Sequence, residues 1–551
     1  MLLAFFLRFY KLGQVPMGLY QDETAIGYNA FSIMQTGMDE YGEKMPVYFK
    51  SFGDYKLPVY IYASIIPIRL FGLNEYSVRF ISAFFGFLTV LVAYFLVYEL
   101  AKSKKLAFVT ILMMAVNPWH LHYSRATFEV SLVLFFYVLG YFLLLKSFFG
   151  NKRFVFFAGT LCFILSFYSY NLTRLLSPLI YILIIILNIK SLKNISKNEI
   201  FFTIFLSFAA FSPFVFTFFE SGGFTSAKGT IIFTSAQIRA QILEFRSYII
   251  TIPIVFSKII FNNLFLTIWQ YIKNIISYFS VEFFFLNGSS HGNHGIGNVG
   301  LFYVIEIPLI ILGAYKILKE KIWYGYTIFG WVAITIFVAS LTREAPHATR
   351  SFVLIFPYCL LSAAGMSWAI RCIDRKLSKK YKGFIIITFC LLAGFNILYY
   401  FISYYFIFPV KYAPAWRGSD RDISFFLAQR QNDFDEIIID RKANFPYTSY
   451  LFYNQFDPLE FQKTQIRKGP DNEGFDEINS FGKIKYENLN WEEIMSLRGR
   501  KLVVVSSGNS NQKLNPIKTF YYQKRPVVVA SKETILSYPV QDIAYLVYEI
   551  K

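Results

Sequence analysis

The chain has 551 residues, of which 55% are hydrophobic, 20% are aromatic and 16% are charged. Soluble domains carry about 25% charged residues, so this composition excludes an ordinary soluble enzyme and indicates an integral membrane protein. The formal net charge is +19. It does not indicate nucleic-acid binding, because the basic residues cluster in short loops between apolar runs, as the positive-inside rule describes.

The first ten residues are apolar, but they are too few to cross a hydrocarbon core of about 30 Å. They also lack the basic n-region and the small-residue cleavage site of a signal peptide. We interpret this segment as the outer end of a first transmembrane helix whose beginning is missing from the sequence.

Ten further apolar segments are predicted to span the membrane, which brings the expected total to about 11 transmembrane helices. They are residues 77–99, 106–122, 127–146, 154–170, 173–189, 200–219, 300–318, 322–341, 350–370 and 383–408. Lysine- and arginine-rich loops, such as residues 102–105, 190–197 and 371–382, all fall on one side of this arrangement. That side is therefore predicted to be cytoplasmic.

Two apolar stretches are predicted to lie in the membrane interface. Residues 58–72 number only about 15 and include Pro67 and Arg69, and counting them as a span would place the basic residues 102–105 outside. Residues 248–286 are interrupted by Trp269 and Lys273, so this stretch is predicted to be interfacial or re-entrant.

Charged residues become frequent from about residue 411. Strand-like runs and helical patterns follow one another there, at residues 422–431, 436–439, 491–497, 502–505 and 545–548. We predict a transmembrane catalytic domain at residues 1–410 and a soluble α/β domain at residues 411–551 on the non-cytoplasmic side. Residues 13–76 and 221–299 are predicted to be large extracytoplasmic loops of the first domain.

The adjacent carboxylates Asp22 and Glu23 follow the N-terminal apolar segment. Acids at a bilayer surface in such an apolar chain are costly, so they are candidates for function. Alternatively, Asp22 caps a helix that begins at Glu23. The two interpretations are compatible, because a cap fixes the position of a carboxylate.

The other predicted non-cytoplasmic loops contain further polar candidates. A carboxylate can take a proton from a hydroxyl, and arginine can hold a phosphate through two hydrogen bonds. An arginine at a helix end can instead be a membrane anchor, but several on the side that should be poor in arginine favour a function. The candidates in these loops are Asp54, Lys56, Arg125, Arg174, His347 and Arg350.

Several of these motifs resemble the GT-C superfamily of membrane glycosyltransferases, in particular the branch of the protein O-mannosyltransferases and the lipid A aminoarabinose transferases. The motif Arg8-Phe9-Tyr10-Lys11-Leu12-Gly13, followed by Asp22-Glu23, carries the resemblance. Residues 54–62 are similar to the family's Lys-Pro-Pro-Leu-Tyr-Tyr-like element, although only Pro58 is present. Phe71-Gly72-Leu73 and Arg79 are similar to the turn that follows. The resemblance extends through about residue 408.

The resemblance implies a GT-C fold and the transfer, with inversion, of a sugar from a polyprenyl-phosphate carrier to a hydroxyl of a protein, lipid or glycan acceptor. It implies that Asp22 is the general base and that Glu23 supports it or orients the acceptor. Lys56, Arg125, Arg174 and Arg350, with His347 nearby, are candidates to hold the lipid phosphate. The expected location is the plasma membrane, with the active site and the C-terminal domain outside the cytoplasm.

The glycine-rich loop of residues 289–298 contains His291 and His294. These two histidines could ligate a metal ion together with Glu282 or Asp54. We favour a polar loop that contacts the sugar or the phosphate, and we predict no metal cofactor, because this branch of the superfamily generally needs none.

Two other classes of protein stay open. A transporter or flippase would place ionisable groups at the bilayer midplane, whereas the predicted spans here are nearly free of acids. A ligase or polymerase of lipid-linked glycans also acts outside the cytoplasm, and only the Asp22-Glu23 pair separates it from the glycosyltransferase reading. The C-terminal domain shows no catalytic pattern, and we predict a binding or structural role for it.

Overall fold

The structure is a computed structural model that describes residues 1–550 except 53, 151–153, 221–235, 249–257, 259, 471–475, 497, 512, 523–524, 531–534 and 541. Contacts divide the chain into two compact units. The helical unit consists of Met1–Leu7, Phe85–Tyr123 and Phe128–Tyr399. The second unit, here called the loop–sheet unit, consists of Arg8–Phe84, Ser124–Thr127 and Tyr400–Lys551.

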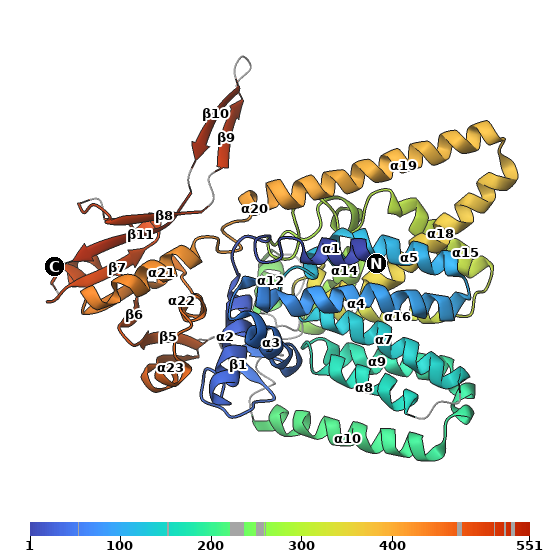
Figure 1. The fold of residues 1–551 in the computed structure, drawn as a ribbon, viewed down its shortest axis with the longest axis horizontal. Helices are drawn as coiled ribbons and strands as arrows, with labels where there is room; N and C mark the ends of the chain where they lie inside the picture. Colours follow the sequence, from blue (N-terminus) through green and yellow to red (C-terminus); the bar gives the residue numbers. More distant parts are fainter. Residues whose placement is uncertain are drawn as a thin grey trace. The chain divides into compact units, whose positions relative to one another are not determined.

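The predicted membrane segments fold as helices (Figure 1). α1 (Leu2–Phe9) and α4 (Glu75–Ala101) each contribute residues to both units. The helical unit contains α5 (Lys104–Val116), α6 (Pro118–Tyr123), α7 (Val130–Phe149), α8 (Val155–Phe167), α9 (Thr173–Leu187), η1 (Ile189–Asn194), α10 (Lys197–Glu220), α12 (Ala236–Tyr248), α14 (Asn263–Ser277), η3 (Glu282–Leu286), α15 (Glu306–Lys319), α16 (Gly325–Ala339), α17 (Ala348–Ser351), η4 (Phe352–Leu354) and α18 (Ile355–Lys376). It also contains most of α19 (Lys379–Ile402), whose last residues belong to the loop–sheet unit.

Within the described residues, five helical stretches are long and apolar enough to cross a membrane. They are Glu75–Ala101, Val130–Phe149, Lys197–Val215, Ala348–Arg375 and Lys379–Lys411. Four shorter apolar helices lie at Pro58–Phe71, Val155–Phe167, Thr173–Leu187 and Gly325–Ser340. The prediction of a helical, multi-pass membrane protein is confirmed.

Several predicted spans form shorter helices than expected, and two of them depart most from their predicted bounds. The segment 106–122 is interrupted at Asn117, whose backbone is extended (φ −60°, ψ 128°). The reason is Pro118, since the residue before a proline is disfavoured in the helical conformation. The segment 300–318 becomes an α-helix only at Glu306, where α15 begins.

Helices α15 and α18 approach each other closely through glycines. A Cβ atom added to Gly313 would collide with the carbonyl oxygen of Leu361, and one added to Gly365 would collide with that of Leu309. Small residues at such a contact let two membrane helices pack backbone against backbone.

The loop–sheet unit joins the predicted first loop to the C-terminal domain. Its N-terminal elements are α2 (Gln21–Thr36), β1 (Phe49–Ser51), β2 (Asp54–Lys56) and α3 (Pro58–Phe71). Its C-terminal elements are η5 (Ser403–Ile407), α20 (Phe408–Lys411), α21 (Asp420–Arg430), η6 (Gln431–Asp433), β3 (Glu436–Asp440), η7 (Arg441–Ala443), α22 (Tyr447–Tyr453), α23 (Pro458–Thr464), β4 (Ile466–Pro470), β5 (Asp476–Phe481), β6 (Ile484–Glu487), α24 (Trp491–Ser496), β7 (Lys501–Val505), η8 (Ser507–Asn509), β8 (Lys518–Tyr521), β9 (Arg525–Ala530), β10 (Ile535–Val540) and β11 (Ile543–Ile550).

The C-terminal sheet has the strand order β4-β5-β6-β3-β7-β11-β8, and its three predicted strand runs are found in β3, β7 and β11. Strand β3 is parallel to both of its neighbours, β6 and β7, whereas the other pairs are antiparallel. The prediction of a C-terminal α/β region is confirmed. Strands β9 and β10 form a separate antiparallel pair.

Helices cover both faces of this sheet. On one face, Ile494 of α24 packs with Ile438 and Val503. On the other face, Tyr545 of β11 donates a hydrogen bond of 2.6 Å to Asp420, the first residue of α21, and Ser449 of α22 donates to the same carboxylate. Helix α22, which follows β3 in the sequence, therefore lies on one face of the sheet, and α24, which follows β6, lies on the other. The carboxyl ends of β3 and β6 form a topological switch point, where open α/β sheets bind ligands.

Candidate functional site

Helix α2 places the first candidate carboxylate near solvent. The helix begins at Gln21 with Tyr20 as its N-cap, so the expectation that Asp22 caps a helix starting at Glu23 is wrong. The reason is that the Glu23 carboxylate reaches back to accept a hydrogen bond of 3.3 Å from the Tyr20 amide, as an acidic residue at the third helical position commonly does. Asp22 lies in the first turn, where its negative charge complements the helix dipole.

Asp22 and Lys56 form an ion pair. The Asp22 Oδ2 and Lys56 Nζ atoms are 3.0 Å apart, and the two side chains are 40% and 14% exposed, respectively. Lys56 ends strand β2 of the β1–β2 hairpin, which brings it to the start of α2. The structure therefore joins two of the three candidate residues that the matching motifs carry, which are Asp22, Glu23 and, more weakly, Lys56. The Asp54 side chain lies outside the described residues.

Glu23 is buried in the interior of the loop–sheet unit. Its side chain is fully buried, and its two carboxylate oxygens lie 2.9 and 3.0 Å from Nε and Nη2 of Arg79. The Thr127 amide and hydroxyl each donate a further hydrogen bond of 2.9 Å to Oε1. A carboxylate with these partners anchors the start of α2, and it is not available to an acceptor in this conformation.

Two buried arginines hold the loop that precedes Asp22. Arg79 donates hydrogen bonds to the carbonyl oxygens of Leu12, Pro16 and Gly18. Arg125 donates to the carbonyl oxygens of Arg8, Lys11 and Val15, at 3.1–3.3 Å. These six hydrogen bonds fix residues 8–18 to Arg79 and Arg125, which come from two other parts of the sequence. Sequence reasoning assigned Arg125 to the donor phosphate, and that contact stays a prediction.

The remaining candidates belong to the helical unit, where three histidine rings lie near one another. The ring centroids of His294 and His347 are 4.8 Å apart, and His291 lies 6.0 and 6.3 Å from them. His347 caps α17 by accepting a hydrogen bond of 3.2 Å from the Thr349 amide, and the Thr349 hydroxyl lies 3.1 Å from Nδ1 of His294.

His347 is a neutral side chain in this environment. Burial, and then the neighbouring charge of Arg350, lower the pKa of His347 to about 2. It can offer a hydrogen bond but no positive charge to a phosphate.

Among the described residues, no group of three or more His, Cys, Asp or Glu side chains is arranged to hold a metal ion. Glu282, which the sequence offered as a possible ligand beside His291 and His294, accepts a hydrogen bond from Asn287.

The two candidate arginines of the helical unit also have protein partners. Arg350 donates to the Thr342 hydroxyl and the Glu344 carbonyl at 2.9 and 2.8 Å. The Arg174 guanidinium lies 5.1 Å from the centre of the Phe214 ring. The structure thus brings Asp22, Glu23, Lys56 and Arg125 into one unit, and it places the other described candidates in the helical unit.

Another buried carboxylate in the loop–sheet unit, Glu40, has two partners that sequence reasoning missed. Glu40 is fully buried and accepts a hydrogen bond of 3.0 Å from the Tyr447 hydroxyl, and Nη2 of Arg467 lies 3.9 Å from it. Burial raises the pKa of Glu40 to about 7, because the cost of desolvation exceeds the attraction of Arg467. No motif marks Tyr447 or Arg467, since their function depends on partners about 400 residues away in the sequence.

The comparisons with known proteins agree with the N-terminal motifs. Residues 1–168 match the family model described as dolichyl-phosphate-mannose-protein mannosyltransferase. None of the curated proteins compared with the chain matches it significantly.

Two solved structures are also similar to the chain. ArnT from Cupriavidus metallidurans in the apo state is 12% identical, with a TM-score of 0.49, over 99% of this chain and 96% of that chain. The archaeal oligosaccharyltransferase AglB from Archaeoglobus fulgidus, in complex with an inhibitory peptide and a dolichol-phosphate, is 12% identical over 83% of this chain and 62% of that chain, with a TM-score of 0.45.

Asp22, Glu23, Lys56, Arg79 and Arg125 all fall within the part of the chain that matches the family model. Over residues 1–168, the chain is therefore similar to the dolichyl-phosphate-mannose-protein mannosyltransferases, which confirms the resemblance predicted from its N-terminal motifs.

Proposed function

We propose that this protein transfers a sugar from a polyprenyl-phosphate carrier to an acceptor hydroxyl, with inversion at the anomeric carbon, and that Asp22 is the general base. One observation carries this proposal. Asp22 is a partly exposed carboxylate in the first turn of a helix whose start is fixed by the buried Glu23–Arg79 pair. A base held this rigidly near solvent can meet an acceptor hydroxyl without rearrangement of its own helix.

The reaction is a single displacement. The acceptor hydroxyl gives its proton to the Asp22 carboxylate while its oxygen attacks the anomeric carbon. The bond between that carbon and the phosphate oxygen breaks, and the polyprenyl phosphate leaves with the electron pair. Lys56, which is paired with Asp22 in this structure, supplies a positive charge for the departing phosphate. When Lys56 moves to the phosphate, the Asp22 carboxylate becomes available to the acceptor.

The other candidates have supporting roles in this proposal. Glu23 positions Asp22 and does not contact the acceptor, because its carboxylate is buried and fully engaged. Arg174, Arg350, His291, His294 and His347 stay candidates for donor binding, with His347 as a neutral hydrogen-bonding group. The proposal needs no metal ion.

We further propose that the active site and the C-terminal domain lie on the extracytoplasmic side of the plasma membrane, since the basic loops lie on the opposite side of the predicted topology.

The experiment that tests the proposed function is a transfer assay. Purified full-length protein is mixed with radiolabelled polyprenyl-phosphate mannose, with related labelled donors in parallel, and with membrane extract as a source of acceptor. Label should move from the carrier to an extract component. Failure to bind any donor of the panel would contradict the proposal.

A further inference from the structure

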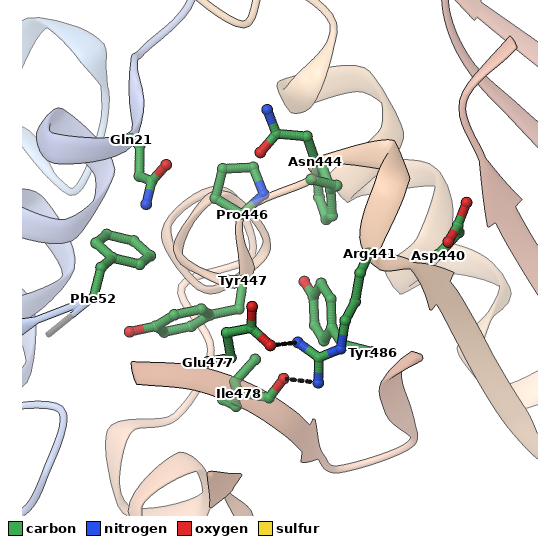
Figure 2. A pocket seen from close by; sticks show the side chains of 11 residues that line it. Gln21, Phe52, Asp440, Arg441, Asn444, Pro446, Tyr447, Glu477, Ile478 and Tyr486 are labelled. Atoms are coloured by element: carbon green, nitrogen blue, oxygen red, sulfur yellow. Dashed lines mark hydrogen bonds and ion pairs between the residues drawn. The ribbon is translucent and has the colours of Figure 1, made fainter. Parts of the chain in front are cut away.

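A pocket of about 280 Å³ lies in the loop–sheet unit, at the switch point of the C-terminal sheet (Figure 2). It is lined by Gln21 and Phe52 from the first loop and by Asp440, Arg441, Asn444, Phe445, Pro446, Tyr447, Glu477, Ile478 and Tyr486 from the C-terminal domain. Asp440 ends β3, and Tyr486 lies near the end of its parallel neighbour β6. The carboxyl ends of these strands are where the fold itself favours a ligand site.

Two residues that line the pocket are close in sequence to the proposed catalytic base and to Lys56. Gln21 directly precedes Asp22 in the first turn of α2, and Phe52 follows the strand that pairs with the Lys56 strand. A molecule in the pocket would therefore lie against the elements that carry Asp22 and Lys56.

One lining group, the Tyr486 hydroxyl, has no hydrogen-bond partner among the described residues. Tyr486 is only 7% exposed. Leaving a buried hydroxyl without a partner is costly. Figure 2 shows the Tyr486 hydroxyl among the lining side chains of the pocket, so a ligand there can provide the missing hydrogen bond.

The charged groups that line the pocket already have protein partners. Arg441 Nη1 lies 2.9 Å from the Glu477 carboxylate, and its Nη2 donates to the Ile478 carbonyl and the Asn479 side chain. The buried Asp440 carboxylate accepts hydrogen bonds from the Lys442 amide and the Asn509 side chain. The pocket therefore does not favour a phosphate or another strongly charged ligand.

The uncharged lining groups fit a sugar ring. Phe52 and Tyr447 present aromatic rings 5.3 Å apart and inclined at 55°, and an aromatic face suits the C–H-rich face of a pyranose. The Gln21 amide makes no hydrogen bond to the described residues. Asn444 is exposed, and although its Oδ1 accepts a hydrogen bond of 3.4 Å from Arg417, its side-chain NH2 group is left to donate. Amide groups can donate to and accept from adjacent sugar hydroxyls. The volume is near the lower end of ligand pockets, as expected for one or two sugar units.

We propose that this pocket binds a neutral sugar unit of the acceptor, so that the transferase extends or decorates a glycan and the C-terminal domain selects it. The acceptor role rests on the function proposed above, whereas the binding of a neutral sugar does not.

The test is a binding experiment on the full-length protein in detergent. The probes are the methyl glycosides of glucose, galactose, mannose and N-acetylglucosamine, followed by saturation-transfer NMR. At least one should bind to the wild type. Tyr486→Phe removes only the unpartnered hydroxyl and should weaken that binding about three- to tenfold. The matched control is Tyr453→Phe, which removes another buried hydroxyl that has no partner among the described residues and does not line the pocket; it should leave binding unchanged.

Three results would overturn the proposal: no glycoside binds, Tyr486→Phe binds as tightly as the wild type, or a serine- and threonine-containing peptide binds in a Tyr486-dependent manner while the glycosides do not. Binding of labelled polyprenyl phosphate to the same samples separates the two proposals. Donor binding without sugar binding contradicts the pocket alone, whereas sugar binding without donor binding contradicts the transferase function and leaves the sugar site intact.

Discussion

The Glu23 carboxylate and the Arg79 guanidinium form a two-point ion pair at 2.9 and 3.0 Å, and neither side chain is exposed to solvent. The pair joins the start of α2 to α4, and Arg79 extends it to three carbonyl oxygens of the preceding loop. The position of Asp22 therefore depends on a buried ion pair that includes its own neighbour in the sequence.

Removing one partner of this ion pair should destabilise the protein. Glu23→Gln or Arg79→Met would leave the other group buried without its counter-charge, at an expected cost of about 3–5 kcal/mol in unfolding free energy. Thermal unfolding in detergent, followed by circular dichroism, measures the effect. Arg430→Ala is the control, because Arg430 and Asp433 form an exposed pair that should contribute less than about 1 kcal/mol. Equal effects of the buried and exposed changes would contradict this account.

Lys56→Gln should weaken donor binding. Loss of a charged group that contacts a phosphate is expected to raise the Kd for polyprenyl phosphate by roughly tenfold or more. Equilibrium binding of labelled polyprenyl phosphate checks this, with Lys50→Gln, in the paired strand of the same hairpin, as the control. An unchanged Kd in the Lys56 variant would leave Lys56 as a structural partner of Asp22.

Stability should depend on pH through Glu40. Its pKa rises from an ordinary value of 4.5 to about 7 in the folded protein, chiefly through desolvation. Because the folded pKa is raised, the contribution of Glu40 is fully present below the unfolded pKa and is lost as the pH rises through 7. The Tm of the wild type should fall across this range, and that of Glu40→Gln should fall less. Parallel pH profiles would show that Glu40 is not the group responsible.

The topology predicts which engineered cysteines react with reagents that cannot cross the membrane. In a background with Cys372→Ser and Cys390→Ser, a cysteine at Ser378 in the basic loop should resist labelling from outside intact cells. A cysteine at Ser510 in the C-terminal domain should react readily. Both positions are exposed, so accessibility within the protein does not limit the reaction. The opposite pattern of labelling would invert the proposed orientation.

The apolar helices and the main strands could be predicted from the sequence because each coincides with a run of hydrophobic residues. The apolar segment 173–189 became α9, and the runs at residues 436–439 and 502–505 became β3 and β7. Asn117 and Gln21 show the limit of this reasoning: a proline ended one helix early, and a side-chain contact from Glu23 started another early. Such boundaries depend on individual hydrogen bonds and on local backbone geometry.

The candidate site could be predicted only in part. Asp22 and Lys56 were found by their motifs, and the structure brings them together. The buried positions of Glu23 and Arg125 could not be predicted, since neither the Asp22-Glu23 motif nor the loop that contains Arg125 indicates which side chains are buried. The pocket at Tyr486 was also missed, because its lining comes from both ends of the chain.

The most direct test of the central claim compares Asp22→Asn with the wild type in the transfer of radiolabelled sugar from polyprenyl phosphate, together with donor binding and thermal stability. The substitution keeps the size of the side chain and removes its ability to accept the proton. We expect transfer to fall by at least about a hundredfold, while donor binding and Tm stay close to those of the wild type. Substantial transfer by a folded Asp22→Asn variant that binds donor would contradict the role of Asp22 as the general base.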